Sequence, residues 1–182
     1  MTPLRVVVTG SECTGKTTLA RQLAERFGAP WAPEYSRGYS EAKPAPLGSE
    51  DVEPIARGEM AAADAAEERA TDLLVLDTDL LSTVVYARHY YGACPAWIEE
   101  AARARRGDLY LLCTPDLPWT ADGVRDRGEA REEMHRLFSA ELARAGADVR
   151  LVSGAGPPRM EAAVAFVAEA LARRSPAAGS GG

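Results

Sequence analysis

Apolar residues follow two alternating patterns along this chain of 182 residues. Short runs rich in β-branched and leucine residues predict strands at residues 4–9, 73–76, 109–113 and 149–152, with a weaker, proline-containing strand at 29–33. Apolar residues spaced about four apart predict helices at 16–27, 49–70, 80–91, 96–105, 134–145 and 160–171. Glycine and proline punctuate the rest, so residues 38–48 are predicted to be a loop.

This alternation of strands and helices predicts an α/β fold with a five-stranded parallel sheet and helices on both faces. The length suits one domain, for which we predict residues 1–174. Residues 175–182 form a Gly/Ser/Ala/Pro tail that is predicted to be disordered, because it has nothing to bury. In such sheets ligands bind beyond the carboxyl ends of the strands, so functional residues are expected there.

Composition narrows the classes of function. The chain is 46% hydrophobic and 26% charged, as expected of a globular protein, and its net charge of −6 disfavours a nucleic-acid partner. No apolar run reaches the length of a membrane span, and the N-terminus has no signal-peptide pattern. Three widely spaced cysteines argue against a disulfide framework, so we expect a cytoplasmic protein.

A glycine-containing octapeptide joins the first predicted strand to the first predicted helix: Gly10-Ser11-Glu12-Cys13-Thr14-Gly15-Lys16-Thr17. It fits the phosphate-binding P-loop pattern G-x-x-x-x-G-K-[ST] in the required strand–loop–helix context. Backbone N–H groups and the helix N-terminus would attract the phosphates of ATP or a similar nucleotide. We expect Lys16 to reach the β- and γ-phosphates and Thr17 to bind Mg²⁺, with Thr18 completing the nucleotide site.

Acidic residues follow the buried strand at 73–76. Asp77 stands at the strand end, where a carboxylate can hold Mg²⁺ through water, and it is also a candidate catalytic base. Asp79 lies two residues further on and is a candidate substrate-binding residue. The alternative for Asp79 is a structural one, the N-cap of the following helix.

A second polar segment, Glu34-Tyr35-Ser36-Arg37-Gly38-Tyr39, follows the weak strand. Glu34 could accept the proton of an attacking hydroxyl, and Arg37 could steady the charge of a transferring phosphate. Tyr35 and Tyr39 could pack against a planar substrate. The alternative is a solvated loop with an Arg–Glu ion pair.

A third polar segment at about 115–131 has the composition of a lid. It contains Trp119, Asp122, Arg125 and Arg131, of which the arginines could close over phosphates and exclude water. The alternative is an exposed, charge-mixed connection. Taken with the phosphate loop, this segment predicts a P-loop kinase-like three-layer sandwich with a lid.

These blocks together resemble the ribosylnicotinamide kinase domain of the NadR family over roughly residues 4–172. The P-loop is shared with many families, whereas Glu34-Tyr35-Ser36-Arg37-Gly38-Tyr39, Asp77-Thr78-Asp79 and Trp119 with Asp122-Gly123-Val124-Arg125 are more specific. The resemblance implies ATP-dependent phosphorylation of the 5′-hydroxyl of nicotinamide riboside, which gives nicotinamide mononucleotide. It also implies Mg²⁺, and substrate contacts from Glu34, Tyr35, Arg37, Tyr39, Asp79, Trp119 and Asp122.

Two alternatives stay open at this stage. One is a kinase for another nucleoside or nucleotide, and the other is a nucleotide-dependent switch or scaffold that binds a protein partner. The residues favour neither ATP nor GTP as donor, neither Asp77 nor Glu34 as base, and no particular oligomeric state. We expect small-molecule ligands and neither a nucleic-acid nor a membrane partner.

Overall fold

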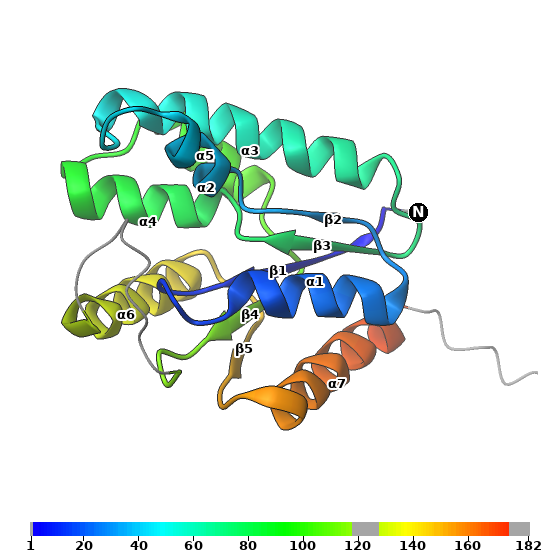
Figure 1. The fold of residues 1–182 in the computed structure, drawn as a ribbon. Coiled ribbons are helices and arrows are strands. Elements are labelled where there is room, and N and C mark those ends of the chain that lie inside the picture. Colours follow the sequence, from blue (N-terminus) through cyan, green and yellow to red (C-terminus); the bar gives the residue numbers. More distant parts are fainter. Residues whose placement is uncertain (1, 118–127, 175–182) are drawn as a thin grey trace, which may run out of the picture.

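The computed structural model describes residues 2–117 and 128–174. Its five strands form one parallel sheet in the order β2-β3-β1-β4-β5 (Figure 1). The strands are β1 (Leu4–Thr9), β2 (Trp31–Ala32), β3 (Leu73–Asp77), β4 (Leu109–Cys113) and β5 (Val149–Val152). The helices are α1 (Lys16–Phe27), α2 (Tyr35–Ala42), η1 (Ser49–Asp51), α3 (Val52–Glu67), α4 (Leu80–Tyr91), α5 (Ala96–Ala104), α6 (Gly128–Arg144) and α7 (Gly156–Arg174). The predicted five-stranded α/β fold is confirmed.

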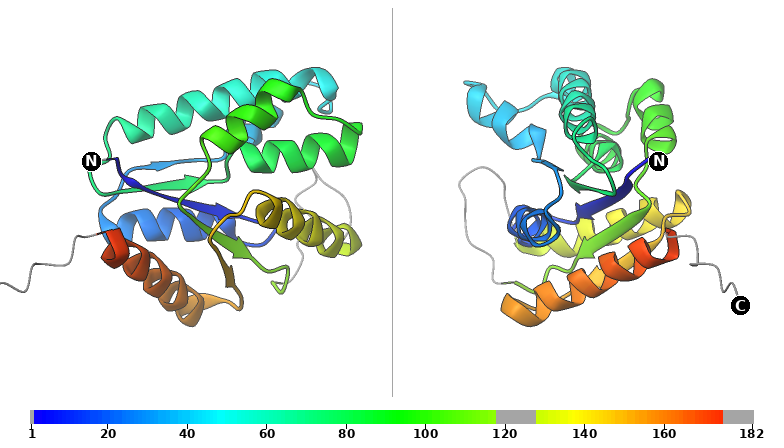
Figure 2. Two further views of the ribbon diagram at one scale, coloured as in Figure 1. Left: turned by 180° about the vertical axis from the view of Figure 1, so that it is seen from behind. Right: turned by 90° about the vertical axis from the view of Figure 1, so that its right-hand side faces the viewer.

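Helices cover both faces of this sheet (Figures 1 and 2). Successive side chains of a strand point to opposite faces, so each strand contributes to two separate cores. Leu74 and Leu76 pack in the core that includes residues of α3, α4, α5 and α6. Leu73 and Val75 pack in the core that includes residues of α1 and α7. This alternation explains why strands buried on both faces appear in the sequence as continuous apolar runs.

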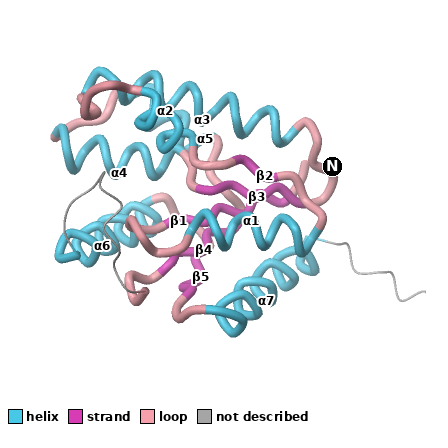
Figure 3. The backbone as a smooth tube through the Cα atoms, in the orientation of Figure 1, coloured by secondary structure: helices cyan, strands magenta, loops and turns pink. Residues whose placement is uncertain are grey.

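The loop predicted for residues 38–48 is wrong over its first part, because α2 extends from Tyr35 to Ala42 (Figure 3). The helix is held by its packing against α3, and sequence periodicity does not reveal such a contact. The ring of Tyr35 lies where a side chain on Gly58 of α3 would be, so a larger residue at Gly58 would displace that ring. The Tyr39 hydroxyl also donates a 2.9 Å hydrogen bond to Oδ1 of Asp51. Two other predicted helices are slightly too long, because α3 ends at Glu67 and α5 at Ala104, and the last two begin earlier than predicted, α6 at Gly128 and α7 at Gly156.

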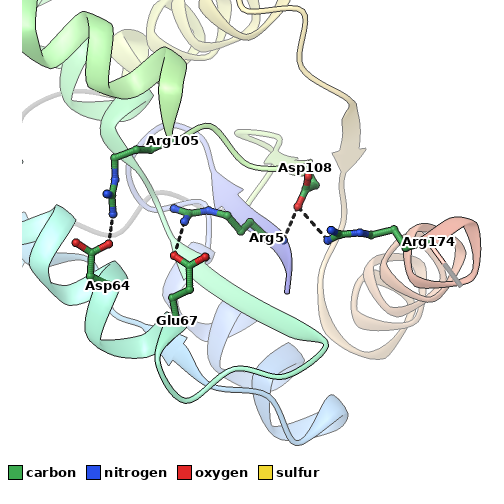
Figure 4. A network of polar contacts seen from close by, with 6 residues as sticks. All are labelled: Arg5, Asp64, Glu67, Arg105, Asp108 and Arg174. Carbon is green, nitrogen blue, oxygen red and sulfur yellow. Dashed lines mark hydrogen bonds and ion pairs between the residues drawn. The ribbon is translucent and has the colours of Figure 1, made fainter. Parts of the chain in front are cut away.

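Charged residues bridge the elements at the amino ends of the strands (Figure 4). The Arg5 guanidinium donates to Glu67 at 2.8 Å, and the Arg5 backbone N–H donates to Asp108 at 2.8 Å. Asp108 also pairs with Arg174 at 3.4 Å. This network lies at the amino ends of the strands, away from the carboxyl ends where ligands bind. We therefore infer that it stabilises the fold and takes no part in ligand binding.

Two observations complete the fold. No helix within the described ranges has the length and apolar content needed to cross a membrane. The predicted disordered tail at 175–182 lies outside the described residues.

Candidate active site

The octapeptide after β1 has the backbone of an anion-binding loop. Gly10 has φ +137°, and a Cβ there would stand 2.8 Å from the carbonyl oxygen of Cys113, so glycine is required. Cys13 (φ 54°) and Gly15 (φ 73°) also have left-handed conformations, and Gly15 is the N-cap of α1. Left-handed residues in a loop of this kind orient nearby backbone N–H groups toward one point, where an anion can bind. The structure therefore supports the predicted phosphate site.

Polar side chains of this loop are buried and close together. The Lys16 side chain is buried, and its Nζ donates to the carbonyl oxygen of Ser11 at 2.8 Å. The Thr14 hydroxyl donates to the same oxygen at 2.8 Å. The Ser11 hydroxyl is buried without a partner among the described residues, as expected of a group that would contact a ligand.

Two arginines from distant helices hold the outer side of the loop. Arg131 lies in the first turn of α6, so this end of the predicted lid is helical. Its guanidinium donates to the carbonyl oxygens of Cys13 (3.4 Å), Pro115 (3.1 Å) and Leu117 (3.0 Å). Arg159 of α7 is buried and donates to the carbonyl oxygens of Thr14 at 2.5 Å and Gly154 at 3.0 Å.

Asp77 lies beside the phosphate loop at the end of β3. It follows Val75 on the face that α1 covers, and its Oδ2 accepts a 2.6 Å hydrogen bond from the Thr17 hydroxyl. Burial raises the pKa of Asp77, and the charge of Glu34 adds to this rise. The Thr17 hydroxyl and the Lys16 ammonium act in the opposite direction. Lys16, Thr17 and Asp77, predicted separately from two motifs, thus meet at one point.

A cavity of about 780 Å³ lies next to this carboxylate, within the volume range of small-molecule sites. Its walls come from α2, the loop at 43–48, α3 and α4. Glu34 and Thr78 lie at the end nearest Asp77, and Tyr86 and Tyr90 supply aromatic surface with rings stacked at 6.1 Å. The cavity is therefore large enough to hold a small molecule near Asp77.

Of the residues predicted to bind the acceptor, some line this cavity and others lie outside it. The Glu34 side chain is 8% exposed, lines the cavity, and accepts a 3.0 Å hydrogen bond from the Ser36 hydroxyl. Arg37 is exposed and lies 3.7 Å from Glu34, which is the Arg–Glu pair of the alternative interpretation.

Tyr35 and Tyr39 are not among the residues that line the cavity, and their contact with a planar substrate stays a prediction. Residues four apart lie on one side of a helix, and in α2 that side packs against α3. The side of α2 that lines the cavity is instead formed by Ser36 and Ser40.

Asp79 is the N-cap of α4, which was the alternative to its predicted substrate contact. Its Oδ1 accepts from the Leu81 N–H at 3.1 Å and caps α4, and its Oδ2 accepts from the Tyr110 hydroxyl at 2.6 Å. A substrate contact by Asp79 stays a prediction. The predicted residues Trp119, Asp122 and Arg125 lie outside the described residues.

Comparison with known proteins agrees with this geometry. A family model described as an AAA domain matches residues 5–159, which is most of the chain. The chain belongs to this AAA-domain family. The resemblance to NadR is also confirmed, since the chain is 31% identical over 142 residues to the trifunctional NAD biosynthesis/regulator protein NadR of Escherichia coli (strain K12). The match covers 73% of this chain and 34% of that relative, so the chain spans about a third of its length.

Solved structures of NadR proteins and of a thymidylate kinase have folds similar to that of this chain. A NadR protein in complex with NR has a TM-score of 0.75 and 30% identity, over 93% of this chain and 52% of that one. A NadR protein in complex with NAD and AMP-PNP has a TM-score of 0.75 and 29% identity, over 93% and 50%. Thymidylate kinase from Ehrlichia chaffeensis has a TM-score of 0.65 at 12% identity, over 94% and 100%, which supports the kinase-like fold alone.

The side chains of this AAA-domain protein suit Mg²⁺ beside the phosphates. Oδ1 of Asp77 is buried without a hydrogen-bond partner among the described residues, and the Thr17 hydroxyl lies against Oδ2. Oxygen donors of this kind are the ligands that Mg²⁺ prefers, and the ion keeps several waters. Thr17 and Asp77 would therefore hold the ion, as predicted.

Sequence reasoning missed several residues of the site. Arg159 has no motif around it, so only the fold reveals its contact with the phosphate loop. Glu59 of α3 and Thr83 of α4 line the cavity and hydrogen-bond each other at 2.8 Å. A polar and aromatic stripe on α4, with Ser82, Tyr86 and Tyr90 spaced four apart, was the signal that could have indicated this wall.

Proposed function

We propose that this protein is an ATP-dependent kinase that phosphorylates the 5′-hydroxyl of nicotinamide riboside and releases nicotinamide mononucleotide and ADP. The observation that carries the proposal is the position of Asp77, which accepts a hydrogen bond from Thr17 of the phosphate loop and lies near Glu34 of the cavity wall. A phosphate donor on the loop and a nucleoside-sized acceptor in the cavity would meet near this carboxylate. The similarity to a NadR protein crystallised with NR supports the choice of acceptor.

The donor would occupy the loop between β1 and α1. Backbone N–H groups and the helix N-terminus bind the phosphates, and Lys16 neutralises charge that develops on the γ-phosphoryl group. Arg131 and Arg159 act from outside by holding loop carbonyl oxygens in place. Mg²⁺, when bound at Thr17 and Asp77, would neutralise phosphate charge.

The acceptor hydroxyl would enter from the cavity, between Glu34 and Asp77. A bond forms from the hydroxyl oxygen to the γ-phosphorus while the bond from that phosphorus to the β,γ-bridging oxygen breaks, so ADP departs. The hydroxyl proton passes to a carboxylate. Glu34 is favoured for this step because it lines the cavity, whereas Asp77 is engaged by Thr17. The transition state is loose, so orienting the hydroxyl matters as much as basicity.

A nucleoside panel tests the proposal. We would measure ADP formation from MgATP with nicotinamide riboside, the common ribo- and deoxyribonucleosides and their monophosphates, and identify each product by mass. Nicotinamide riboside should stimulate ADP formation most strongly, and Lys16→Ala should abolish the stimulation. Faster phosphorylation of another nucleoside would replace the acceptor, and ADP formation that no acceptor stimulates would favour the switch or scaffold alternative.

A further inference from the structure

The cavity contains a carboxylate that the proposed reaction does not use. Glu59 lies on α3, and its two oxygens accept hydrogen bonds from Thr78 at 3.0 Å and Thr83 at 2.8 Å. These hydroxyls come from the β3–α4 junction and from α4, so they fix the plane of the carboxylate from two sides. Thr78 itself has φ 68°, an uncommon conformation for threonine, and its hydroxyl bond to Glu59 accompanies that conformation.

Glu59 has hydrogen-bond donors but no countercharge. Within residues 2–117 and 128–174, no lysine or arginine forms an ion pair with it. Burial raises the pKa of Glu59 to about 8, and the neighbouring charges of Asp79 and Glu34 raise it further, while the two threonine hydroxyls oppose the rise.

The basic groups around this carboxylate are already paired. Lys43, on the cavity wall, is paired with Asp51 and also lies 3.5 Å from Glu50. Arg5 and Arg105, which border a small second cavity that Glu59 also lines, are paired with Glu67 and Asp64 respectively. His89 is the remaining titratable nitrogen of the cavity wall, and its ring lies against Tyr90 at 4.8 Å.

We propose that Glu59 is a specificity-determining residue that makes this cavity select an acceptor with a positively charged ring, such as a pyridinium riboside, over a neutral nucleoside. The inference rests on the proposed function and deepens it. A partly buried carboxylate without a countercharge is stabilised when a cation approaches, because the attraction between them is stronger than in bulk water. A neutral ring of the same shape gains nothing comparable, so the preference reflects charge and not fit.

The other acidic groups of the cavity are less suited to this role. Asp51 is already neutralised by Lys43, and Gly48 donates its N–H to the same carboxylate at 2.7 Å. Glu34 lies beside Arg37 and near Asp77, at the reacting end of the cavity. Glu59 is therefore the carboxylate whose charge a bound cation would balance.

Nicotinamide riboside and its dihydro form provide a matched pair for the test. The two have nearly the same size and the same ribose, but the ring of the dihydro form has gained a hydride and lost the positive charge. We would measure kcat/KM for both with the wild-type protein, with Glu59→Gln, and with Glu53→Gln. Glu53→Gln removes the same charge from an exposed position on the same helix, outside the cavity.

The wild type should prefer the cationic riboside. Glu59→Gln should reduce that preference by about 10-fold or more, chiefly through KM for the cationic riboside, whereas Glu53→Gln should leave it unchanged. The wild-type preference should also increase as pH rises from 7 to 9, because the deprotonated carboxylate is the form that attracts the cation. This pH measurement needs no variant, so it tests the inference even if Glu59→Gln fails to fold.

The outcomes separate this inference from the proposed function. If both ribosides are phosphorylated and Glu59→Gln or the change of pH leaves their ratio unchanged, the role of Glu59 is overturned and the kinase assignment stands. If the wild type phosphorylates neither riboside, the proposed function is overturned and the inference falls with it.

Discussion

The Thr17 hydroxyl donates a 2.6 Å hydrogen bond to Oδ2 of Asp77, across 60 positions of sequence. This contact joins the first turn of α1 to the carboxyl end of β3, because β3 lies beside β1 in the sheet and Asp77 points to the face that α1 covers. It brings the Thr17 hydroxyl and the Asp77 carboxylate, the two predicted Mg²⁺ ligands, next to each other. Much of the proposed chemistry depends on this single arrangement.

Asp77→Asn should lower kcat by about 100-fold or more, because the amide is a poorer Mg²⁺ ligand than the carboxylate. Steady-state kinetics across a Mg²⁺ titration would measure the effect, and the apparent Mg²⁺ requirement should also rise. Asp72→Asn is the matched control, since Asp72 is an exposed aspartate just before the other end of β3. Wild-type turnover in Asp77→Asn would contradict the assignment.

Glu34→Gln should lower kcat by about 100-fold while changing KM for the acceptor less, because a lost proton acceptor affects the transition state more than binding. Glu41→Gln, at an exposed position in α2, the helix that follows Glu34, should behave as wild type. A nearly unchanged kcat in Glu34→Gln would contradict Glu34 as the catalytic base and favour Asp77.

Arg159→Met should raise KM for ATP about 10-fold, since the Thr14 carbonyl loses a buried charged donor and the phosphate loop loosens. Methionine is unbranched like the aliphatic part of arginine, so it keeps most of the packing volume. Calorimetric titration with a non-hydrolysable ATP analogue would report the affinity directly. Arg173→Met, on the exposed side of the same helix, controls for loss of charge, and equal affinities in the two variants would refute the prediction.

Gly10→Ala and Gly38→Ala should change stability in opposite directions. At Gly10 the added Cβ meets the Cys113 carbonyl oxygen at φ +137°, so we expect a loss of about 2 kcal/mol or more. At Gly38, inside α2, nothing lies within 4 Å of the added Cβ, so alanine should stabilise the protein by roughly 0.5–1 kcal/mol. Urea denaturation of both variants measures this, and destabilisation by Gly38→Ala would argue against the helix that the structure shows.

Glu59→Gln should become more stable relative to wild type as pH rises. Burial raises the pKa of Glu59 from 4.5 to about 8, so between these values the folded protein holds a proton that the unfolded chain releases. The free energy of unfolding of the wild type therefore falls as pH rises through this window. Glutamine does not titrate, so the variant does not show this fall. Urea denaturation at pH 5, 7 and 8.5 would reveal the divergence, and parallel curves would show that Glu59 ionises normally.

Local patterns predicted most elements closely. The bounds of α1 and α4 match the predicted residues, as do those of β1, β4 and β5, because each has a regular apolar spacing and a clear stop. The helix α2 was not predicted, since residues 34–39 were interpreted as a polar segment and residues 38–48, which begin with Gly38, as a loop. Its packing against α3 decides both its existence and the direction of Tyr35 and Tyr39.

The sequence by itself determined the phosphate loop, the α/β alternation and the candidate carboxylates at strand ends, because all three depend on neighbours in the chain. Only the tertiary structure decided which carboxylate meets which hydroxyl. Glu59 reaches Thr78 and Thr83 across 19 and 24 positions, and Arg159 reaches Thr14 across 145. Such contacts, and the burial that shifts the pKa of Glu59, depend on how helices pack on the sheet, which no local spacing specifies.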